Sequence, residues 1–479
     1  MYIGLDLGTS GLKGVLIDDQ QTILAEAHAP LEAVRPAPGW SEQAPAAWLD
    51  AADAVMQALS AKQSLALVKA IGLSGQMHGA TLLDADDAVL RPCILWNDTR
   101  SAVEAAELDA DPEFRSITGN IVFPGFTAPK LVWVARHEPE VFAKVAKVLL
   151  PKDYLRLWLT GEHVAEMSDA AGTSWLDVGA RDWSYTLLAK SGMSRSQMPR
   201  LVEGSEVSGK VRDELASRWG LSAEVVVAGG GGDNASSAVG VGVVKAGDAF
   251  VSLGTSGVLF AACDAYQPDP ASAVHTFCHA LPDTWHQMGV ILAAADALNW
   301  FAGIADKPAA TLSGVLGPLQ APSRTLFLPY LGGERTPHND ASIRGSFLHL
   351  DHATDQIALT RAVLEGVTHA IRDSLDALTG TGTRIERLIA VGGGSKSDYW
   401  VQAIATSLNL PVALPVAGDF GGAFGAARLG MMAASGAGIE LATPPAIART
   451  IDPDTKLTGA FAEAHDRYRA SYDALKGLQ

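Results

Sequence analysis

The feature that most restricts the fold of this sequence is a hairpin signal that occurs twice, once near the start and once near mid-chain. Residues 7–11 and residues 253–257 both read Leu-Gly-Thr-Ser-Gly. Each copy lies between two apolar runs, and the run before the first copy alternates as a half-buried strand does. Small residues permit a tight reversal between antiparallel strands. Two related domains that each contain this hairpin explain the repeat better than chance recurrence does.

The length of the chain also indicates more than one domain. Its 479 residues exceed the size at which a single hydrophobic core stops growing. Gly240, Gly242 and Gly247 precede the second hairpin and mark a boundary near residues 240–248. We therefore predict an N-terminal domain over residues 1–243 and a C-terminal domain over residues 244–479.

Strand and helix patterns follow one another within both halves. Residues 225–228 form a short apolar run, as in a buried strand, and helical spacing of leucine, valine and isoleucine predicts a long helix over residues 355–378. A strand over residues 388–391, a glycine turn and a helix over residues 397–408 come next. This mixture predicts α/β domains.

Charge and cysteine content exclude several classes of function. The net charge of −17 argues against nucleic-acid binding, because a phosphate backbone attracts a basic surface. No window approaches the length of an apolar membrane span, and the N-terminus has no signal-like apolar run. Cys93, Cys263 and Cys278 show no metal-ligand pairing. We expect a cytoplasmic protein with reduced thiols.

The paired turns are candidate phosphate-binding loops. Glycine-flanked turns present backbone N–H groups and hydroxyls without obstructing side chains, which suits an anionic phosphate. Each copy taken alone is better explained as an ordinary hairpin. The pair, with Asp6 before the first copy and Lys13 after it, favours nucleotide binding. The candidate residues are Gly8, Thr9, Ser10, Lys13, Gly254, Thr255 and Ser256.

A second candidate is Asp233, which follows the apolar run 225–228 and four glycines and precedes Asn234. A carboxylate at the end of a buried strand can accept a hydroxyl proton as that oxygen attacks phosphorus. This role requires no raised pKa. The alternative is an Asx turn or a helix N-cap, since Asp and Asn serve both.

Two further segments carry side chains suited to a polyhydroxylated ligand. Residues 74–79 contain Met77 and His78 between glycines, and Trp96 opens the polar run of residues 96–100. A single His in a loop is more often structural. Residues 204–210 imitate a phosphate-binding Walker loop, but Val211 replaces the required Ser or Thr. The histidines and cysteine near residues 275–286 have no second ligand cluster to form a zinc site.

Taken together, these segments resemble the FGGY family of carbohydrate kinases, and in particular its branch that phosphorylates D-xylulose. The likeness runs from Tyr2 to beyond Gly430. It implies an actin/hexokinase/Hsp70-like fold, in which two ribonuclease H-like α/β domains flank a cleft. The matching blocks are residues 1–13, 76–79, 125–133, 232–234, 254–257, 333–338 and 392–394.

The resemblance implies transfer of the ATP γ-phosphoryl group to O5 of D-xylulose, with Mg²⁺ held through water by Asp6 and Asp233. Asp233 is then the base, and Met77, His78, Asn234 and Trp96 bind the sugar. Gly392, Gly393 and Gly394 form the adenosine loop. The resemblance assigns no individual roles to residues 334–338, and it leaves the choice between a monomer and a homodimer open.

Two departures and two alternatives remain. His349 stands where the family's second signature usually has glycine, and Ala358 where it has a polar residue. A related kinase acting on ribulose, gluconate or glycerol is one alternative. A nucleotide-driven switch of the Hsp70 or actin type is the other, although it would have no need of the loop at residues 76–79.

Overall fold

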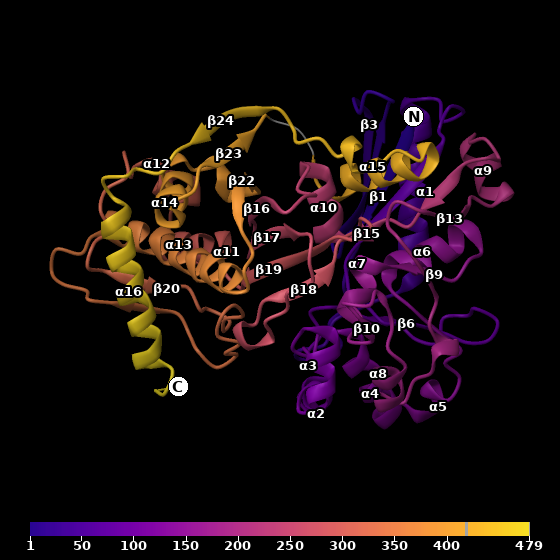
Figure 1. The fold of residues 1–479 in the computed structure, drawn as a ribbon, viewed down its shortest axis with the longest axis horizontal. Helices are drawn as coiled ribbons and strands as arrows, with labels where there is room; N and C mark the ends of the chain where they lie inside the picture. The colour runs from indigo at the N-terminus through magenta and orange to yellow at the C-terminus, as the bar shows by residue number, and fades with distance from the viewer. Residues whose placement is uncertain (417–419, 479) are drawn as a thin grey trace. The chain divides into compact units, whose positions relative to one another are not determined.

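The computed structural model of this protein describes residues 1–416 and 420–478. They form two compact units, coloured along the chain in Figure 1. The first unit contains Met1–Val244, Phe277–His286 and residues 420–444. The second contains Lys245–Thr276 and residues 287–416 and 445–478. Two segments that follow residue 244 in the sequence thus pack into the first unit.

The first unit is built on a mixed sheet whose order is β13-β14-β5-β1-β2-β3, with β15 also paired to β5. Strands β1 and β2 form the predicted hairpin, and β3 extends it to an antiparallel meander. Strands β1, β14 and β15 run parallel to β5. The bounds are β1 Tyr2–Leu7, β2 Gly11–Ile17, β3 Ile23–Pro30, β5 Ala70–Gly75, β13 Val207–Lys210, β14 Val226–Ala228 and β15 Gly231–Gly232.

The second unit repeats this plan, with the strand order β18-β19-β17-β16-β22-β23-β24. The hairpin β16–β17 is antiparallel, as β1–β2 is, and β22 runs parallel to β16, as β5 does to β1. Next in the sheet, β23 runs parallel to β22, as β14 does to β5. The edge strand β24 runs antiparallel to β23, as β13 does to β14. The duplicated α/β fold predicted from the two hairpins is therefore confirmed. The bounds are β16 Gly247–Leu253, β17 Gly257–Cys263, β18 His275–Cys278, β19 Trp285–Ile291, β22 Ile385–Val391, β23 Val412–Pro415 and β24 Ile447–Ile451.

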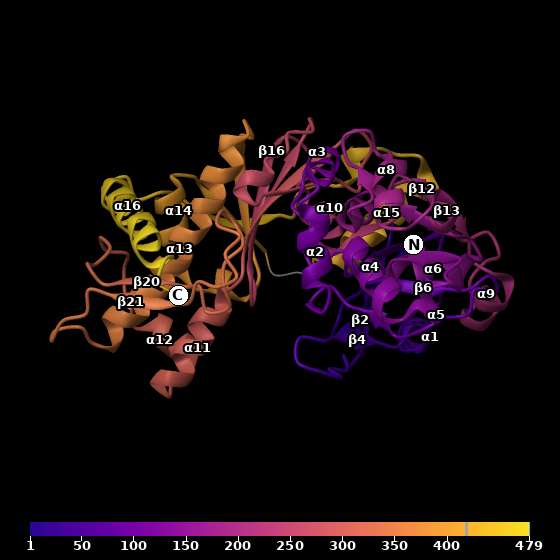
Figure 2. The same ribbon diagram turned by 90° about the horizontal axis from the view of Figure 1, so that it is seen from below.

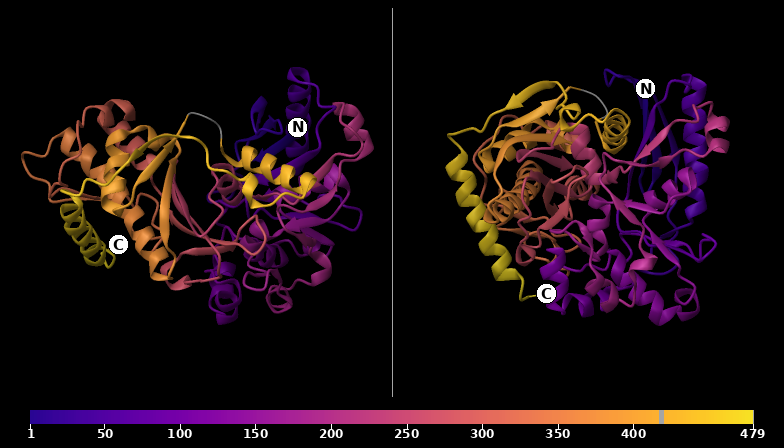
Figure 3. Two further views of the ribbon diagram at one scale, coloured as in Figure 1. Left: turned by 45° about the horizontal axis from the view of Figure 1, so that its top comes forward. Right: turned by 45° about the vertical axis from the view of Figure 1, so that its right-hand side comes forward.

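Helix α15 (Gly422–Ser435) lies against the first sheet, although it comes late in the chain (Figure 3). The helix backbone comes so close to β1 and β5 that only glycine fits at the facing positions of these strands. A Cβ added to Gly4 would lie 1.8 Å from the Ala423 carbonyl oxygen, and one added to Gly72 would lie 1.8 Å from that of Ala426. Helix α10 (Asp233–Val241) packs against α15 in the same way, since a Cβ on Gly425 would lie 1.7 Å from the Ser236 oxygen.

Helix α1 (Pro45–Lys62) covers another part of the first unit. Pro45 begins it, where a missing N–H costs nothing, and its buried residues follow helical spacing. Trp48, Val55 and Leu59 join the core formed with the interiors of β1, β2 and β5. The remaining helices of this unit are α2 Ala102–Asp109, α3 Pro112–Thr118, α4 Thr127–His137, α5 Pro139–Phe142, α6 Pro151–Thr160, α7 Met167–Ala170, α8 Tyr185–Lys190 and α9 Asp213–Trp219.

In the second unit, α13 (Gln356–Gly380) confirms the long helix predicted over residues 355–378, and it packs beside α14 (Asp398–Leu408) (Figure 2). The Asp355 side chain caps α13 by accepting from the Ala358 N–H. Ahead of the helix, His349 has a φ of 58°, the left-handed region that favours glycine. His349 thus adopts a backbone conformation that glycine accepts more readily than residues with a side chain. The other helices are α11 Ala295–Ala305, α12 Ala309–Gly314 and α16 Thr458–Leu475.

Among the residues that the structure describes, no helix is both long enough and apolar enough to cross a membrane.

Candidate functional site

The parallel strands of the first unit end at one edge of the sheet, and three predicted segments follow them there. The Gly8–Gly11 turn follows β1, the loop with Met77 and His78 follows β5, and Asp233 follows β15. In parallel sheets, ligands bind outside the carboxyl ends of the strands. The register places Asp6 beside Ser74 and Ser74 beside Gly231, so the three segments are neighbours.

Asp6 is held by Ser74, the first residue of the candidate segment 74–79. The Ser74 hydroxyl donates to Asp6 Oδ1 at 2.7 Å. Burial raises the pKa of Asp6, while the Ser74 hydrogen bond and the charge of Lys13 act in the opposite direction. Lys13, a candidate nucleotide ligand, is paired with Asp6 in the β1–β2 register, and its Nζ lies 3.7 Å from Glu26 Oε1.

Asp233 is the first residue of helix α10, directly after Gly232. Its Oδ1 accepts from the backbone N–H of Asn234 at 2.7 Å and from the Asn234 side-chain amide at 3.0 Å. Burial, followed by the charge of Asp6, raises the pKa of Asp233 to about 6. The sequence does not predict this shift, because it depends on the burial of Asp233 and on a second carboxylate that the fold brings close.

The Met77–His78 loop is fixed tightly against its surroundings. His78 adopts a φ of 69° and donates from Nδ1 to the Gly172 carbonyl at 2.7 Å, since a carbonyl oxygen can only accept. Its ring stacks on Phe126 with a centroid separation of 4.5 Å. Lys130 Nζ donates to the His78 oxygen at 2.8 Å. Phe126 and Lys130 belong to the block at residues 125–133, so this block supports the loop.

Met77 lies next to the glycines that lead to Asp233. A Cβ added to Gly232 would come within 3.0 Å of Met77 Sδ. The structure therefore places Met77, and with it the loop that contains His78, beside the residue that precedes Asp233.

Trp96 contacts the first Gly-Thr-Ser-Gly turn. Its indole N–H donates to the Thr9 hydroxyl at 3.0 Å, and that hydroxyl donates to Gln76 Oε1 at 2.8 Å. Gln43, which the sequence analysis did not identify, accepts from Gln76 at 3.0 Å and donates to the Thr9 carbonyl at 2.7 Å. The first Gly-Thr-Ser-Gly turn is thus tied to the loop at residues 76–79, while Trp96 remains 49% exposed.

The second unit has an equivalent edge. The Gly254–Gly257 turn follows β16, and the Gly392–Gly394 segment follows the parallel strand β22. Gly392 has a φ of 88°, and a Cβ added to it would lie 2.9 Å from the Leu253 backbone. The carbonyls of Gly254 and Thr255 accept from Ala295 and Ala294, each at 2.8 Å. The two predicted nucleotide loops of this unit are therefore neighbours.

Residues 334–338 bind the end of the strand that leads to the residues holding the Gly254–Gly257 turn. Glu334 Oε1 accepts from the Leu292 N–H at 2.9 Å, and Val290 N donates to the Thr336 hydroxyl at 3.0 Å. Leu292 is followed two residues later by Ala294 and Ala295, whose N–H groups donate to the Gly254–Gly257 turn. No pattern in the sequence indicates this role of Glu334 and Thr336, since their hydrogen bonds are made to backbone groups of residues distant in the sequence.

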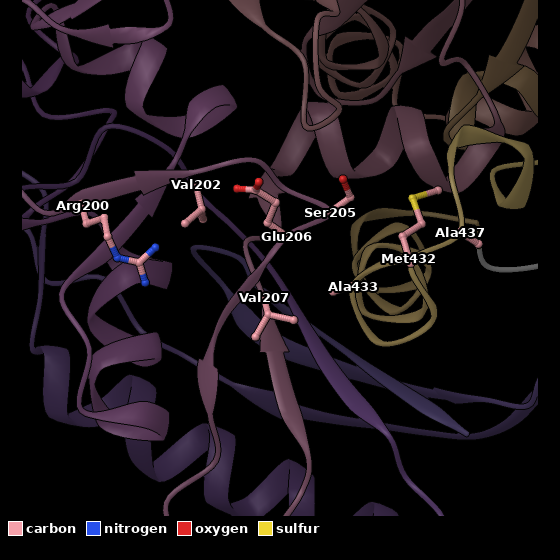
Figure 4. Close-up of a pocket in the computed structure, with 9 residues that line it drawn as sticks. Arg200, Val202, Ser205, Glu206, Val207, Met432, Ala433 and Ala437 are labelled. Carbon is pink, nitrogen blue, oxygen red and sulfur yellow. The ribbon is translucent and has the colours of Figure 1, made fainter.

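The Walker-like residues 204–210 form a turn followed by strand β13, and no helix follows directly as in a phosphate-binding loop. Ser205, Glu206 and Val207 line an open groove of about 510 Å³ with Met432 and the end of α15 (Figure 4). A Cβ added to Gly422 at the start of α15 would touch Asp6, so the groove lies at the opposite end of this helix from Asp6. The groove is not part of the site.

The zinc-like segment is also accounted for. Cys278 donates to the Val178 carbonyl, and His279 Nε2 lies 3.2 Å from the Val243 carbonyl oxygen. Burial lowers the pKa of His279 to about 4. Within the described part of the chain, the residues near 275–286 form no group with metal-ligand geometry.

Comparison with known proteins matches both halves of the chain. The N-terminal domain of the FGGY family of carbohydrate kinases matches residues 1–240, and its C-terminal domain matches residues 249–434. A xylulose kinase from Escherichia coli (strain K12) is 48% identical over 484 residues, 100% of both chains. A solved structure of a xyloylose kinase from Brucella ovis is 64% identical, with a TM-score of 0.98 over 100% of both chains. The xylulose kinase structure from Rhodospirillum rubrum is 31% identical, with a TM-score of 0.93 over 100% of this chain and 99% of that one. The chain belongs to the FGGY family of carbohydrate kinases.

Proposed function

We propose that this kinase transfers the γ-phosphoryl group of ATP to O5 of D-xylulose, giving xylulose 5-phosphate and ADP. The observation that carries the proposal is the position of Asp233 at the sheet edge, beside Met77 and next to the His78 loop. The choice of sugar is supported by the relatives, whose names specify xylulose kinases and which align over the full length of this chain.

Asp233 acts as the proton acceptor. Its carboxylate takes the proton of the sugar hydroxyl as the oxygen bonds to phosphorus, a contribution worth ~10²–10⁴-fold in rate. With a pKa of about 6, Asp233 is mostly ionised at pH 7 and still basic enough to hold a proton. Met77, His78, Asn234 and Trp96 bind and orient the sugar, and orientation of the reacting groups supplies much of the remaining acceleration.

The two acidic side chains fit a divalent cation. The charge of Asp6 raises the pKa of Asp233, so the two carboxylates repel each other, and a cation between them would remove this repulsion. Carboxylate oxygens and water are the ligands that Mg²⁺ prefers. Asp6 and Asp233 would hold Mg²⁺ through water, and the bound ion would neutralise charge on the ATP phosphates.

The nucleotide is bound by the glycine loops. Backbone N–H groups and hydroxyls of the two Gly-Thr-Ser-Gly turns contact the phosphates, and the Gly392–Gly394 segment contacts the adenosine. The residues assigned to ATP are Gly8, Thr9, Ser10, Lys13, Gly254, Thr255, Ser256, Gly392, Gly393 and Gly394. Along the sequence, the two domains are residues 1–243 and 244–479, although residues 277–286 and 420–444 pack into the first unit. A cytoplasmic location belongs to the same proposal, supported by three cysteines that are free, buried thiols.

The test is ADP release with Mg-ATP and a panel of sugars: D-xylulose, D-ribulose, gluconate and glycerol. We expect the highest kcat/KM with D-xylulose. Asp233→Asn, assayed in parallel, separates true turnover from contaminating kinases, because it should lower kcat by ~10²-fold or more while leaving the fold intact. A higher kcat/KM with any other member of the panel would contradict the proposed substrate. Size-exclusion chromatography with light scattering decides between monomer and homodimer.

A further inference from the structure

Five charged side chains lie fully buried beneath the first unit's sheet edge, and the proposed reaction does not use them. Lys152 and its neighbours from α6, α7 and β9 (Val164–Glu166) are each 0% exposed. Lys152 Nζ lies 2.8 Å from Asp153, 3.1 Å from Glu166 and 2.9 Å from Asp169. We refer to Lys152, Asp153, Arg156, Glu166 and Asp169 as the buried charge cluster. Burial of ions costs several kcal/mol each, and apolar replacements are often equally stable, so stability alone does not explain the cluster.

Arg156 binds the start of the glycine run that leads to Asp233. Its Nη1 donates to the Ala228 carbonyl and its Nη2 to the Gly229 carbonyl, both at 2.5 Å. Nη1 also donates to the Ser208 hydroxyl at 2.6 Å. A planar guanidinium with fixed donors holds two successive carbonyls in one geometry. The backbone that enters the run is therefore fixed at its first residues.

The last residue of the run is fixed from the same cluster through Ser168. Glu166 Oε2 accepts from the backbone N–H of Ser168 at 2.7 Å and from its hydroxyl at 2.8 Å. The same hydroxyl accepts from the Gly232 N–H at 3.0 Å. Gly232 directly precedes Asp233. The orientation of the candidate base thus depends on a chain of two hydrogen bonds that begins at a buried carboxylate.

The element that carries Ser168 also holds the sugar loop. Helix α7 continues into a short turn, Ala171–Thr173, and the Gly172 carbonyl in this turn accepts from His78. Glu166 caps the helix by accepting from Asp169 N as well. One buried assembly therefore contacts the segments before Asp233 and the loop with His78.

We propose that Ser168 and Arg156 are positioning residues for the phosphoryl transfer: they hold Gly232 and Gly229 so that the Asp233 carboxylate faces the sugar hydroxyl. The proposal rests on the assignment of Asp233 as the base. Displacement of a catalytic group by about 1 Å can reduce rates ~10²-fold, so loss of one such contact should affect the chemical step more than binding.

The test is Ser168→Ala, which removes the acceptor for Gly232 N–H. We expect the single-turnover rate of phosphoryl transfer to fall ~10-fold or more, with KM for sugar and Mg-ATP within about threefold of wild type. Ser191→Ala is the matched control. Ser191 is also buried, and its hydroxyl accepts from Trp175 Nε1 at 2.7 Å, away from the glycine run. It should lower the melting temperature to a similar extent and leave the rate unchanged.

A second variant keeps the test decisive if Ser168→Ala folds poorly. Arg156→Lys retains the cluster's charge but cannot hold both carbonyls, and the same loss of rate without loss of binding is expected. Rates that match Ser191→Ala, or that fall only in proportion to the folded fraction, would overturn the proposal. All rates are compared on the best substrate of the sugar panel, so a wrong choice of sugar would not affect the outcome. If Asp233→Asn is active, the assignment of the base fails separately.

Discussion

The Ser74 hydroxyl donates to Asp6 Oδ1 at 2.7 Å across the parallel pair β1–β5. This hydrogen bond favours the ionised carboxylate and partly offsets the effect of burial, which raises the pKa of Asp6. Asp6 is the proposed partner of the metal, so its ionisation should limit activity at low pH.

Ser74→Ala should therefore shift the acid limb of the kcat/KM profile to higher pH. Without the hydroxyl, the pKa of Asp6 rises further, so at a given acidic pH a larger fraction of the variant than of wild type holds a neutral Asp6. The concentration of Mg²⁺ needed for half-maximal activity should rise with it. An acid limb that coincides with that of wild type would show that Asp6 does not titrate in the active range.

Asp233→Asn should lower kcat by ~10²-fold or more and change the KM for xylulose much less, because it removes proton affinity but keeps the size of the side chain. In wild type, the acid limb should include a group near pH 6, the pKa of Asp233. A folded variant with near-normal turnover would show that Asp233 is only a helix-start residue.

The stability of Asp233→Asn gives an independent check. A carboxyl whose pKa is raised in the folded state destabilises the fold once it ionises, so the penalty appears as pH rises from about 4 to about 6. The Asn variant should therefore be more stable than wild type at pH 8, by about 1–3 kcal/mol, and equally stable near pH 4. Thermal melts without nucleotide or metal measure this. Lower stability at pH 8 would mean that the carboxylate stabilises the helix.

His78→Ala should raise the KM for xylulose and leave ATP binding nearly unchanged, because the imidazole is placed in the loop beside Met77. His78 has a positive φ, so Ala also adds backbone strain. His78→Asn tolerates this conformation, and a rise in KM shared by both variants would identify the loss of the ring as the cause. If only ATP affinity falls, the loop serves the nucleotide instead.

How far the sequence predicts the structure depends on whether a feature is local. The hairpins, α13 and the glycine turns follow from alternation, helical spacing and residue size over short windows. The packing of α15 against β1 does not, because it depends on the match between Gly4 and Ala423 far along the chain. The raised pKa of Asp233 depends on its burial and on the charge of Asp6, which is distant in the sequence. The burial of Arg156 within α6 also depends on distant residues, since its side chain donates to Ala228 and Gly229.

Gly8→Val and Gly254→Val should weaken nucleotide binding without unfolding the protein. A Cβ on Gly8 would lie 3.3 Å from the nearest atom, the Gly11 oxygen, and one on Gly254 would lie 3.6 Å from the Ser256 oxygen. The contact at Gly254 is an ordinary one, while at Gly8 the Gly11 oxygen would have to shift by a few tenths of an ångström. The added side chain would project where phosphate approaches. Gly459→Val, with no atom within 4 Å of the added Cβ, is the control. Unchanged nucleotide affinity by calorimetry in both loop variants would contradict the assignment.

Gly422→Ala should impair catalysis while leaving the fold intact. Gly422 begins α15, and an added Cβ would lie 2.8 Å from both Asp6 Oδ2 and Ser74 Oγ, so the carboxylate would have to move. Alanine favours helix formation by up to ~1 kcal/mol over glycine, which offsets part of the strain. We expect kcat to fall ~10-fold or more, with an increased requirement for Mg²⁺ and a small change in melting temperature. Gly303→Ala, in helix α11 with no neighbour within 4 Å of the added Cβ, should raise stability slightly and leave kcat unchanged. Wild-type turnover in Gly422→Ala would show that the position of Asp6 does not control the reaction.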